Sequence, residues 1–246
     1  MDDFVFYIPE YYPATAYASG FLRQAGLHVT TEPTNSVTHL LLPVPSFSPD
    51  GKLPDGRSLG ELLSGLSNIP VIVGGNLNRQ ESEGLPTLDL LQIPAYLAQN
   101  ANITAHCAIR LAMDQLQRTL DRCPVLVIGW GRIGKVLCKL LSGLGARVTV
   151  CARKPADRAM AQALGYCVTD IPAAQLDHYK VVFNTVPAML FPQTPPDVLK
   201  IDLASQPGLG GTDVIHARGL PGKDAPESAG ELIAQTLLDI LRKETL

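Results

Sequence analysis

The residue pattern with the clearest chemical meaning is Gly129-Trp130-Gly131-Arg132-Ile133-Gly134, three glycines at the spacing Gly-x-Gly-x-x-Gly. It follows the apolar run 125–128, which is typical of a parallel strand buried on both faces. After it, apolar residues recur at helical spacing as far as Leu144. The pattern indicates dinucleotide binding only between a buried strand and a helix. Both neighbours are predicted here, so we expect a dinucleotide site.

Each glycine has a separate physical role in such a site. Gly129 permits the tight turn out of the strand, Gly131 lets a pyrophosphate approach the backbone, and Gly134 lets the helix pack closely on the sheet. The helix N-terminus adds unpaired N–H groups and partial positive charge. The alternative is an accidental glycine turn. A second predicted strand at 147–151, after a helix ended by Gly145, argues against it.

The end of that second strand bears on the choice of cofactor. An NAD site usually places an Asp or Glu about 20 residues after the motif, where the acid bonds the ribose hydroxyls. Here the strand runs into Ala152-Arg153-Lys154, without an acid. Arginine can bind a 2′-phosphate with two parallel hydrogen bonds, whereas a carboxylate would repel it. We therefore predict NADP rather than NAD, with two solvated surface cations as the alternative.

Composition excludes several classes of function. The chain has 246 residues, 46% of them apolar and 17% charged, as expected for a globular protein of one or two domains. Its net charge of -3 indicates no nucleic-acid or membrane partner. No apolar run reaches the roughly 20 residues of a membrane-spanning helix, and Met1-Asp2-Asp3 lacks signal-peptide features. We expect a cytoplasmic protein. The cysteines and histidines show no metal-ligand spacing, so no metal is expected.

The order of predicted elements is that of a two-domain α/β protein. We expect a smaller N-terminal α/β domain, flavodoxin-like, over residues 1–100, where no phosphate fingerprint occurs. A NAD(P)-binding Rossmann domain with a parallel, doubly wound sheet is predicted over 101–246. It would begin with a connecting helix and end with a C-terminal helix, in which Ser228 and Glu231 have the spacing of a capping box.

Three finer assignments concern the N-terminal half. A helical turn is predicted at 87–91 and a short strand at 95–98. The loop 43–58 is rich in Pro, Ser, Asp and Gly. It follows the carboxyl end of a predicted strand, where ligands of open α/β sheets bind. It is therefore either a substrate lid or a plain connection.

Two later strands are expected to bring side chains to the edge that holds the glycine motif. The strand 180–184 opens into Thr185-Val186-Pro187, and the strand 200–204 opens into Ser205. Because the carboxyl ends of parallel strands share one edge, both exits should line the nicotinamide end. The residues predicted to bind the cofactor are Gly129, Trp130, Gly131, Arg132, Ile133, Gly134, Ala152, Arg153, Lys154, Thr185, Val186, Pro187, Asp202 and Leu220.

The loops after these strands resemble the family of dipicolinate synthase A subunits. The resemblance covers residues 100 to 240 well and is looser before them, at 39–44. The segments that carry it are Asn184-Thr185-Val186-Pro187, Asp202-Leu203-Ala204-Ser205-Gln206-Pro207, Gly211-Thr212-Asp213, Gly219-Leu220-Pro221-Gly222 and Ala225-Pro226-Glu227-Ser228-Ala229-Gly230. The resemblance implies an NADP-linked Rossmann protein. With a flavoprotein-like B subunit, it would oxidise a dihydrodipicolinate-type precursor to dipicolinate, the spore calcium chelator.

Three features depart from the family pattern. His106 and Cys107 stand where we expect an acid and a glycine. The connection 211–219 is shorter than in the family and is expected to lack part of a strand, and the turn 208–211 carries extra residues. The sequence is thus that of a divergent member.

The substrate implied by the resemblance is a small dicarboxylate, so the site must stack two rings, exclude water and bind two carboxylates. Ser205, Thr185, Thr212 and the backbone around Gly222 and Ser228 are the candidate donors.

Charged and titratable candidates are fewer. Arg218 and Lys223 are candidate counter-charges, or else solvated surface cations. His106 and His216 are candidate general bases because imidazole titrates near neutral pH. A non-catalytic role is the alternative for each, since a base must first lie within reach of the substrate.

Two other functions stay open. A 2-hydroxyacid dehydrogenase shares the two-domain plan, but the resemblance would call for a late Pro-His step, and the loop 220–230 contains no histidine. A non-catalytic NADP-binding sensor or scaffold would bind the cofactor without turnover, and the altered residues His106 and Cys107 keep it open. We also expect a homo-oligomer.

Overall fold

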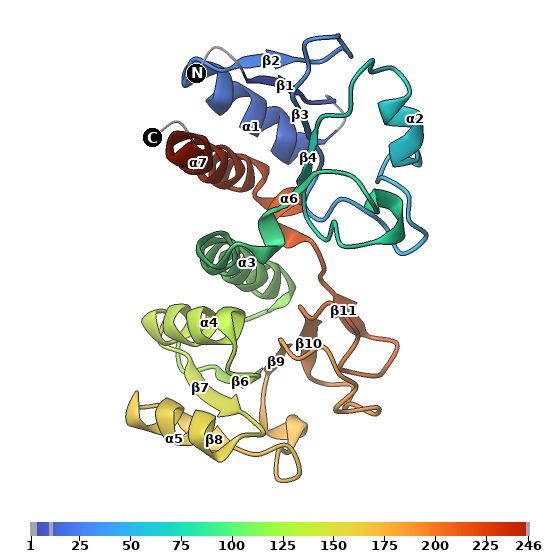
Figure 1. Cartoon of the computed structure of the whole chain (residues 1–246). Helices are drawn as coiled ribbons and strands as arrows, with labels where there is room; N and C mark the ends of the chain where they lie inside the picture. The colour runs from blue at the N-terminus through green and yellow to red at the C-terminus, as the bar shows by residue number, and fades with distance from the viewer. Residues whose placement is uncertain (1–3, 10–11, 245–246) are drawn as a thin grey trace. The chain divides into compact units, whose positions relative to one another are not determined.

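The computed structural model describes residues 4–9 and 12–244 (Figure 1). They divide into two compact units. The first contains the described residues up to Asn100 together with those from Pro221 onward, and the second contains Ala101–Leu220. The chain therefore passes between the units twice.

The first unit is built on five parallel strands in the order β2-β1-β3-β4-β5. This is the strand order of flavodoxin-like folds, so the predicted fold of the N-terminal domain is confirmed. The strands are β1 (Val5–Tyr7), β2 (His28–Thr30), β3 (His39–Leu41), β4 (Val71–Gly74) and β5 (Thr87–Asp89).

The helices of this unit begin and end where local chemistry predicts. Pro13 occupies the first turn of α1, which ends before Gly26 in the left-handed region at φ 86°. Ser58 caps α2 through a reciprocal pair of hydrogen bonds with Glu61. The helices are α1 (Pro13–Gln24), α2 (Leu59–Leu63), α7 (Pro226–Glu244) and the short turns η1 (Gln80–Ser82) and η2 (Leu90–Gln92). Within the described part of the chain, no helix is both long and apolar enough to cross a membrane.

The loop 43–58 is a packed part of this unit. Phe47 and Leu53 are buried in one apolar cluster with Leu40 and Ile72. The Arg79 guanidinium donates to the Ser48 carbonyl at 3.0 Å. These contacts favour the interpretation as a connection over that as a mobile lid.

Two predicted elements of the first unit are wrong. The segment 95–98 is not a strand, because α3 (Pro94–Gln115) begins at Pro94 and buries Tyr96. The segment 87–91 is not a helical turn but β5 followed by η2. Here Thr87 pairs with Ile72 of β4, and Asp89 accepts from the Leu91 N–H at 2.9 Å. Pairing across the sheet overrides local propensity.

The second unit is a six-stranded parallel sheet in the order β11-β10-β9-β6-β7-β8. Counted from β6, this is the order 3-2-1-4-5-6 of Rossmann domains, and the predicted fold is confirmed. Its strands are β6 (Pro124–Ile128), β7 (Arg147–Cys151), β8 (Cys167–Thr169), β9 (Val181–Asn184), β10 (Leu199–Asp202) and β11 (Val214–His216). Its helices are α4 (Arg132–Gly143), α5 (Pro155–Ala163) and the turn η3 (Leu176–His178).

Its central strands β6 and β9 are almost wholly buried. This explains their continuous apolar sequences, because a central parallel strand has no solvated face. The short connection 211–219 still contains a strand, β11, where we expected part of one to be missing.

The C-terminal helix does not belong to the dinucleotide-binding unit, so the domain predicted at 101–246 ends at residue 220 instead. The helix α7 packs along α1 in the first unit (Figure 1). It begins at Pro226, so Ser228 is its third residue and not its N-cap. Periodicity showed that the helix buries one face, but not which element covers that face.

The two helices approach closely at Gly230. A Cβ there would lie 2.4 Å from the Ala14 carbonyl oxygen and 2.8 Å from the Ala18 nitrogen, both backbone atoms that cannot easily move. Gly20 of α1 has no atom within 4 Å of such a Cβ. Packing therefore requires glycine at position 230 but not at position 20.

We predict that Gly230→Ala destabilises the protein by about 1–3 kcal/mol, because overpacking separates the two helices. The matched control Gly20→Ala should be neutral or stabilising by about 0.5–1 kcal/mol, since it only raises helix propensity. Urea unfolding of both variants is the measurement. Equal stability of Gly230→Ala and the unsubstituted protein would contradict this account of the α1–α7 packing.

Candidate dinucleotide-binding site

The glycine turn has the close packing that the sequence predicts. Gly129 is in the left-handed region at φ 104°, and a Cβ on it would lie 2.3 Å from Thr185 Oγ1. A Cβ on Gly134 would lie 2.3 Å from the Gly129 carbonyl oxygen. A Cβ on Gly131 would meet no such atom within 4 Å. Two glycines thus permit contact between strand, turn and helix, and the third leaves the backbone open to a ligand.

The N-terminus of α4 is electrostatically suited to an anion. Gly131 is its N-cap, no side chain caps it, and no acidic residue lies in its first turn. Arg132 and Lys135 are exposed there, where cations are disfavoured by the helix dipole. A bound phosphate would accept from the unpaired N–H groups and offset this positive charge.

A cavity of about 320 Å³ adjoins the turn. It lies between the ends of β6 and β7 and the segment that follows β9. Burial raises the pKa of the Cys151 thiol, on its wall, to about 12, so this residue is a neutral, apolar wall. The residues that line the cavity are Ile128, Gly129, Trp130, Cys151, Ala152, Arg153, Lys154, Asp157, Ile171, Val186, Pro187, Ala188 and Leu190.

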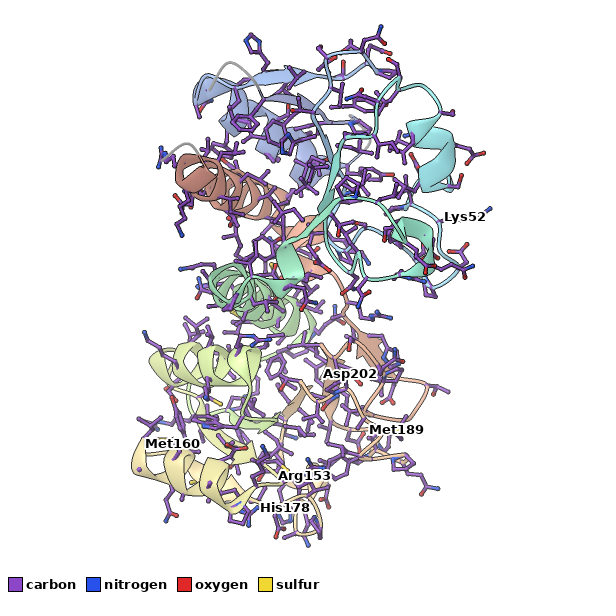
Figure 2. The ribbon with its side chains drawn as sticks, viewed as in Figure 1. Lys52, Arg153, Met160, His178, Met189 and Asp202 are labelled. Atoms are coloured by element: carbon purple, nitrogen blue, oxygen red, sulfur yellow. The ribbon has the colours of Figure 1, made fainter. Side chains whose placement is uncertain are left out.

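The mouth of this cavity carries the two predicted cations and one acid. Arg153 and Lys154 line it with exposed side chains, and no ion pair joins either of them to another described residue (Figure 2 marks Arg153). Asp157 also lines it, in the first turn of α5. We did not predict this acid, since it lies in the helix beyond the end of β7. The preference for acids in a first helical turn is a signal that could have indicated it.

Trp130, the only tryptophan of the chain, packs against protein rather than solvent. It is 8% exposed and meets Tyr166 edge to face, with ring centroids 5.8 Å apart. The Lys135 ammonium lies 5.9 Å from the centre of its ring. Within the described residues its Nε1 has no acceptor. Because Trp130 also lines the cavity, its fluorescence should report on ligand binding.

The segment after β9 is tied to the glycine turn. The Thr185 hydroxyl and backbone N–H both donate to the Ile128 carbonyl, at 2.8 and 2.9 Å. The side chains of Val186 and Pro187 lie on the cavity wall beyond it. Thr185 therefore shapes the crevice, and its hydroxyl proton is already engaged.

Asp202, labelled in Figure 2, is buried, and both of its carboxylate oxygens accept hydrogen bonds. Its Oδ1 accepts from Asn184 Nδ2 at 2.8 Å and from the Ala204 N–H at 3.1 Å. Its Oδ2 accepts from the backbone N–H groups of Gly208 and Leu209, at 2.7 and 3.1 Å. Asp202 thus holds the loops after β9 and β10 in place, whereas we predicted it as a cofactor contact.

The loops are also joined to each other beyond Asp202. The N–H groups of Leu190 and Phe191 both donate to the Gly208 carbonyl, at 2.9 and 3.2 Å. A Cβ on Gly208 would lie 2.3 Å from Asn184 Nδ2. A residue larger than glycine at position 208 would therefore clash with Asn184.

The strand register places the candidate substrate residues Ser205 and Thr212 at opposite edges of the sheet. Ile128, Asn184, Asp202 and His216 are paired in turn across the sheet. Ser205 follows Asp202 and is therefore at the carboxyl edge with the glycine turn. His216 is at that edge too, three strand spacings or about 14 Å along it from Ile128.

Thr212 is at the other edge of the sheet. It precedes β11, whose Val214 pairs with Lys200 near the start of β10. The buried Lys200 ammonium donates to its neighbour Asp213 and lowers the pKa of that carboxyl. Thr212 therefore lies away from the glycine turn, because the loop after β10 crosses back to the amino edge before β11.

The other candidates divide between the units. His106 is exposed on α3, Arg218 is exposed after β11, and Leu220 is buried at the start of α6 (Leu220–Asp224); all three belong to the second unit. Gly222, Lys223 and Ser228 belong to the first unit, within α6 and α7. No group of three metal-ligating side chains occurs among residues 4–9 and 12–244.

Four of the five cysteines are buried, as expected of small apolar residues, and Cys167 is exposed. Burial also raises the pKa of the Cys138 thiol, to about 12.

No protein-family model matches the chain. The A subunit of dipicolinate synthase from Bacillus subtilis (strain 168) is 33% identical over 159 residues, which are 58% of this chain and 53% of that protein. The match thus spans about half of the relative's length. The dipicolinate synthase A subunit of Bacillus halodurans superposes with a TM-score of 0.84 at 23% identity, covering 98% of each chain. The chain resembles dipicolinate synthase A subunits.

The second such structure, the A chain of dipicolinate synthase from Bacillus subtilis, superposes with a TM-score of 0.77 at 22% identity, over 99% of this chain and 97% of the other. The resemblance expected from the loops is thereby confirmed. At these identities the structures establish the fold alone. Dehydrogenases are also among the solved structures that share it.

We predict that Asp202→Asn destabilises the protein by about 1–3 kcal/mol, because an amide NH₂ would then face backbone donors that need an acceptor. Asp177→Asn, on the exposed turn η3, is the matched control and should leave stability unchanged. Urea unfolding checks both. If Asp202→Asn unfolds at the same urea concentration as the unsubstituted protein, Asp202 does not hold the loops.

Proposed function

We propose that the chain is a divergent dipicolinate synthase A subunit, an NADP-dependent oxidoreductase that converts a dihydrodipicolinate-type precursor to dipicolinate during sporulation. The observation that carries the proposal is the cavity beside the open glycine turn, with Arg153 and Lys154 at its mouth. The similarity to the Bacillus subtilis dipicolinate synthase protein and the dehydrogenase fold support it.

The chain's own residues supply binding and orientation in this proposal. The first-turn N–H groups of α4, with Arg132, would bind the pyrophosphate. Arg153 and Lys154 would bind the 2′-phosphate that distinguishes NADP from NAD. The paired loops held by Asp202 would form a rigid wall at the nicotinamide end, with Ser205 as a donor to a substrate carboxylate.

The proposed reaction is balanced without a further co-reactant. When bound, NADP⁺ accepts the hydride that the reduced pyridine ring loses. The ring also loses a proton, to a protein base or to water, and becomes aromatic. His216 is the histidine candidate at the carboxyl edge. The protein must therefore align the two rings and exclude water rather than activate a strong nucleophile.

Partners follow from the resemblance alone. We propose a small dicarboxylate substrate, assembly as a homo-oligomer and a flavoprotein-like B subunit. A non-catalytic NADP sensor is the second candidate, favoured by His106 and Cys107, which depart from the family pattern. The two functions differ in turnover, not in cofactor binding.

The cofactor prediction is tested by titrating NADP and NAD while the fluorescence of Trp130 is recorded. We expect NADP to bind more tightly. Replacing both Arg153 and Lys154 by Ala should weaken NADP binding about tenfold or more, because charge-assisted hydrogen bonds are lost, and should affect NAD little. Asp157→Asn should instead tighten NADP binding, since it removes a negative charge that repels the 2′-phosphate. Equal or tighter binding of NAD would contradict the choice of NADP.

The reaction is tested by mixing the protein, a B subunit, NADP and enzymatically made precursor, and recording the ultraviolet absorption band of dipicolinate. We expect product formation that requires NADP and falls in the Arg153/Lys154 double variant. An established synthase under the same conditions is the positive control. NADP binding without product, where the control turns over, would favour the sensor instead.

A further inference from the structure

Arg158 makes a contact that the cofactor assignment does not explain. It lies in α5, and its Nη1 donates to the carbonyl oxygens of Ala152 and Arg153, both at 2.8 Å. These two carbonyls belong to the turn that joins β7 to α5 at the mouth of the cavity. One guanidinium nitrogen thus joins the helix to the turn.

The two cations on that turn are not held by their own side chains. Arg153 and Lys154 are exposed, and no hydrogen bond or ion pair joins their charged groups to another residue in the described part of the chain. The backbone of Lys154 is held by α5, since its carbonyl accepts from the N–H groups of Asp157 and Arg158 at 3.1 and 3.2 Å. The backbone of the turn therefore sets the positions from which these two side chains extend.

The contact also changes the charge that a ligand meets. Carbonyl oxygens carry partial negative charge, which would disfavour a phosphate nearby. Arg158 occupies two of them and leaves its own positive charge beside the turn. A planar guanidinium loses less conformational freedom in such a contact than a flexible ammonium would.

We propose that Arg158 is a positioning residue for the choice of NADP: it holds the 152–154 turn so that Arg153 and Lys154 can meet the 2′-phosphate. The inference rests on the NADP preference in the proposed function. A merely structural brace would affect the binding of NAD and NADP equally. A positioning role affects NADP more.

The test replaces Arg158 by Met, which keeps an apolar stem of similar length and removes both the charge and the bonds. Dissociation constants are measured for NADP and NAD, and for 2′,5′-ADP and 5′-AMP, which differ only in the 2′-phosphate. We expect Arg158→Met to lower the NADP-to-NAD affinity ratio about tenfold, the size of a lost charge-assisted interaction. NAD affinity should stay within about twofold. The ratio for 2′,5′-ADP over 5′-AMP should fall in parallel.

Two further variants complete the design. Arg147→Met removes an exposed charge at the opposite end of β7 and should leave both ratios unchanged. Arg158→Lys keeps the charge but not the rigid contact, and should lower the NADP-to-NAD ratio about threefold. Thermal unfolding will show whether Arg158→Met folds. If it does not, Arg158→Lys decides the test.

The outcomes separate this inference from the proposed function. If the unsubstituted protein prefers NADP and both Arg158 variants keep that preference, the inference fails and the proposed function stands. Equal loss of NADP and NAD binding also overturns it. If the unsubstituted protein prefers NAD, both fail together. A selective loss of the 2′-phosphate ligands supports the inference.

Discussion

A buried carboxylate must accept hydrogen bonds, because burying an unpaired charge is costly. Asp202 is such a carboxylate, and the loops at the carboxyl edge of the second unit are arranged around it. Its four hydrogen bonds come from Asn184 and from the backbone at Ala204, Gly208 and Leu209. Three of these bonds end on the loop after β10, and the fourth ends on Asn184, the last residue of β9, whose side chain also donates to the Val186 carbonyl in the next loop. The loops after β9 and β10 therefore behave as one body, which forms a wall of the candidate site. An irregular segment becomes a fixed surface because leaving any of these donors unpaired would be costly.

The candidate cofactor-binding residues all lie within one unit. The glycine turn, the cavity and the cations Arg153 and Lys154 all belong to residues 101–220. The remaining candidates for the substrate do not share this property, since Ser205 is in the second unit while Gly222 and Ser228 are in the first. The candidate residues for the substrate are thus divided between the two units, whereas those for the cofactor are not.

Charge at the cavity mouth is balanced rather than uniform. Arg153 and Lys154 face it together with Asp157, while Arg158 is engaged with backbone carbonyls. The acid would limit how strongly the site attracts any anion, and in the proposed function the cations favour a ligand with an additional phosphate. Selectivity between two similar nucleotides then depends on where these groups are held, because Coulomb energy falls with distance and with exposure to water.

The sequence by itself determined the elements and the chemistry that local patterns encode: the two α/β units, the glycine turn and the cations after β7. Only the tertiary structure decided what depends on pairing between distant segments. Register put Thr212 at the far edge of the sheet, and packing assigned α7 to α1. The physical reason is that periodicity shows which face of an element is buried, whereas its partner is chosen by long-range contacts that leave no local signal.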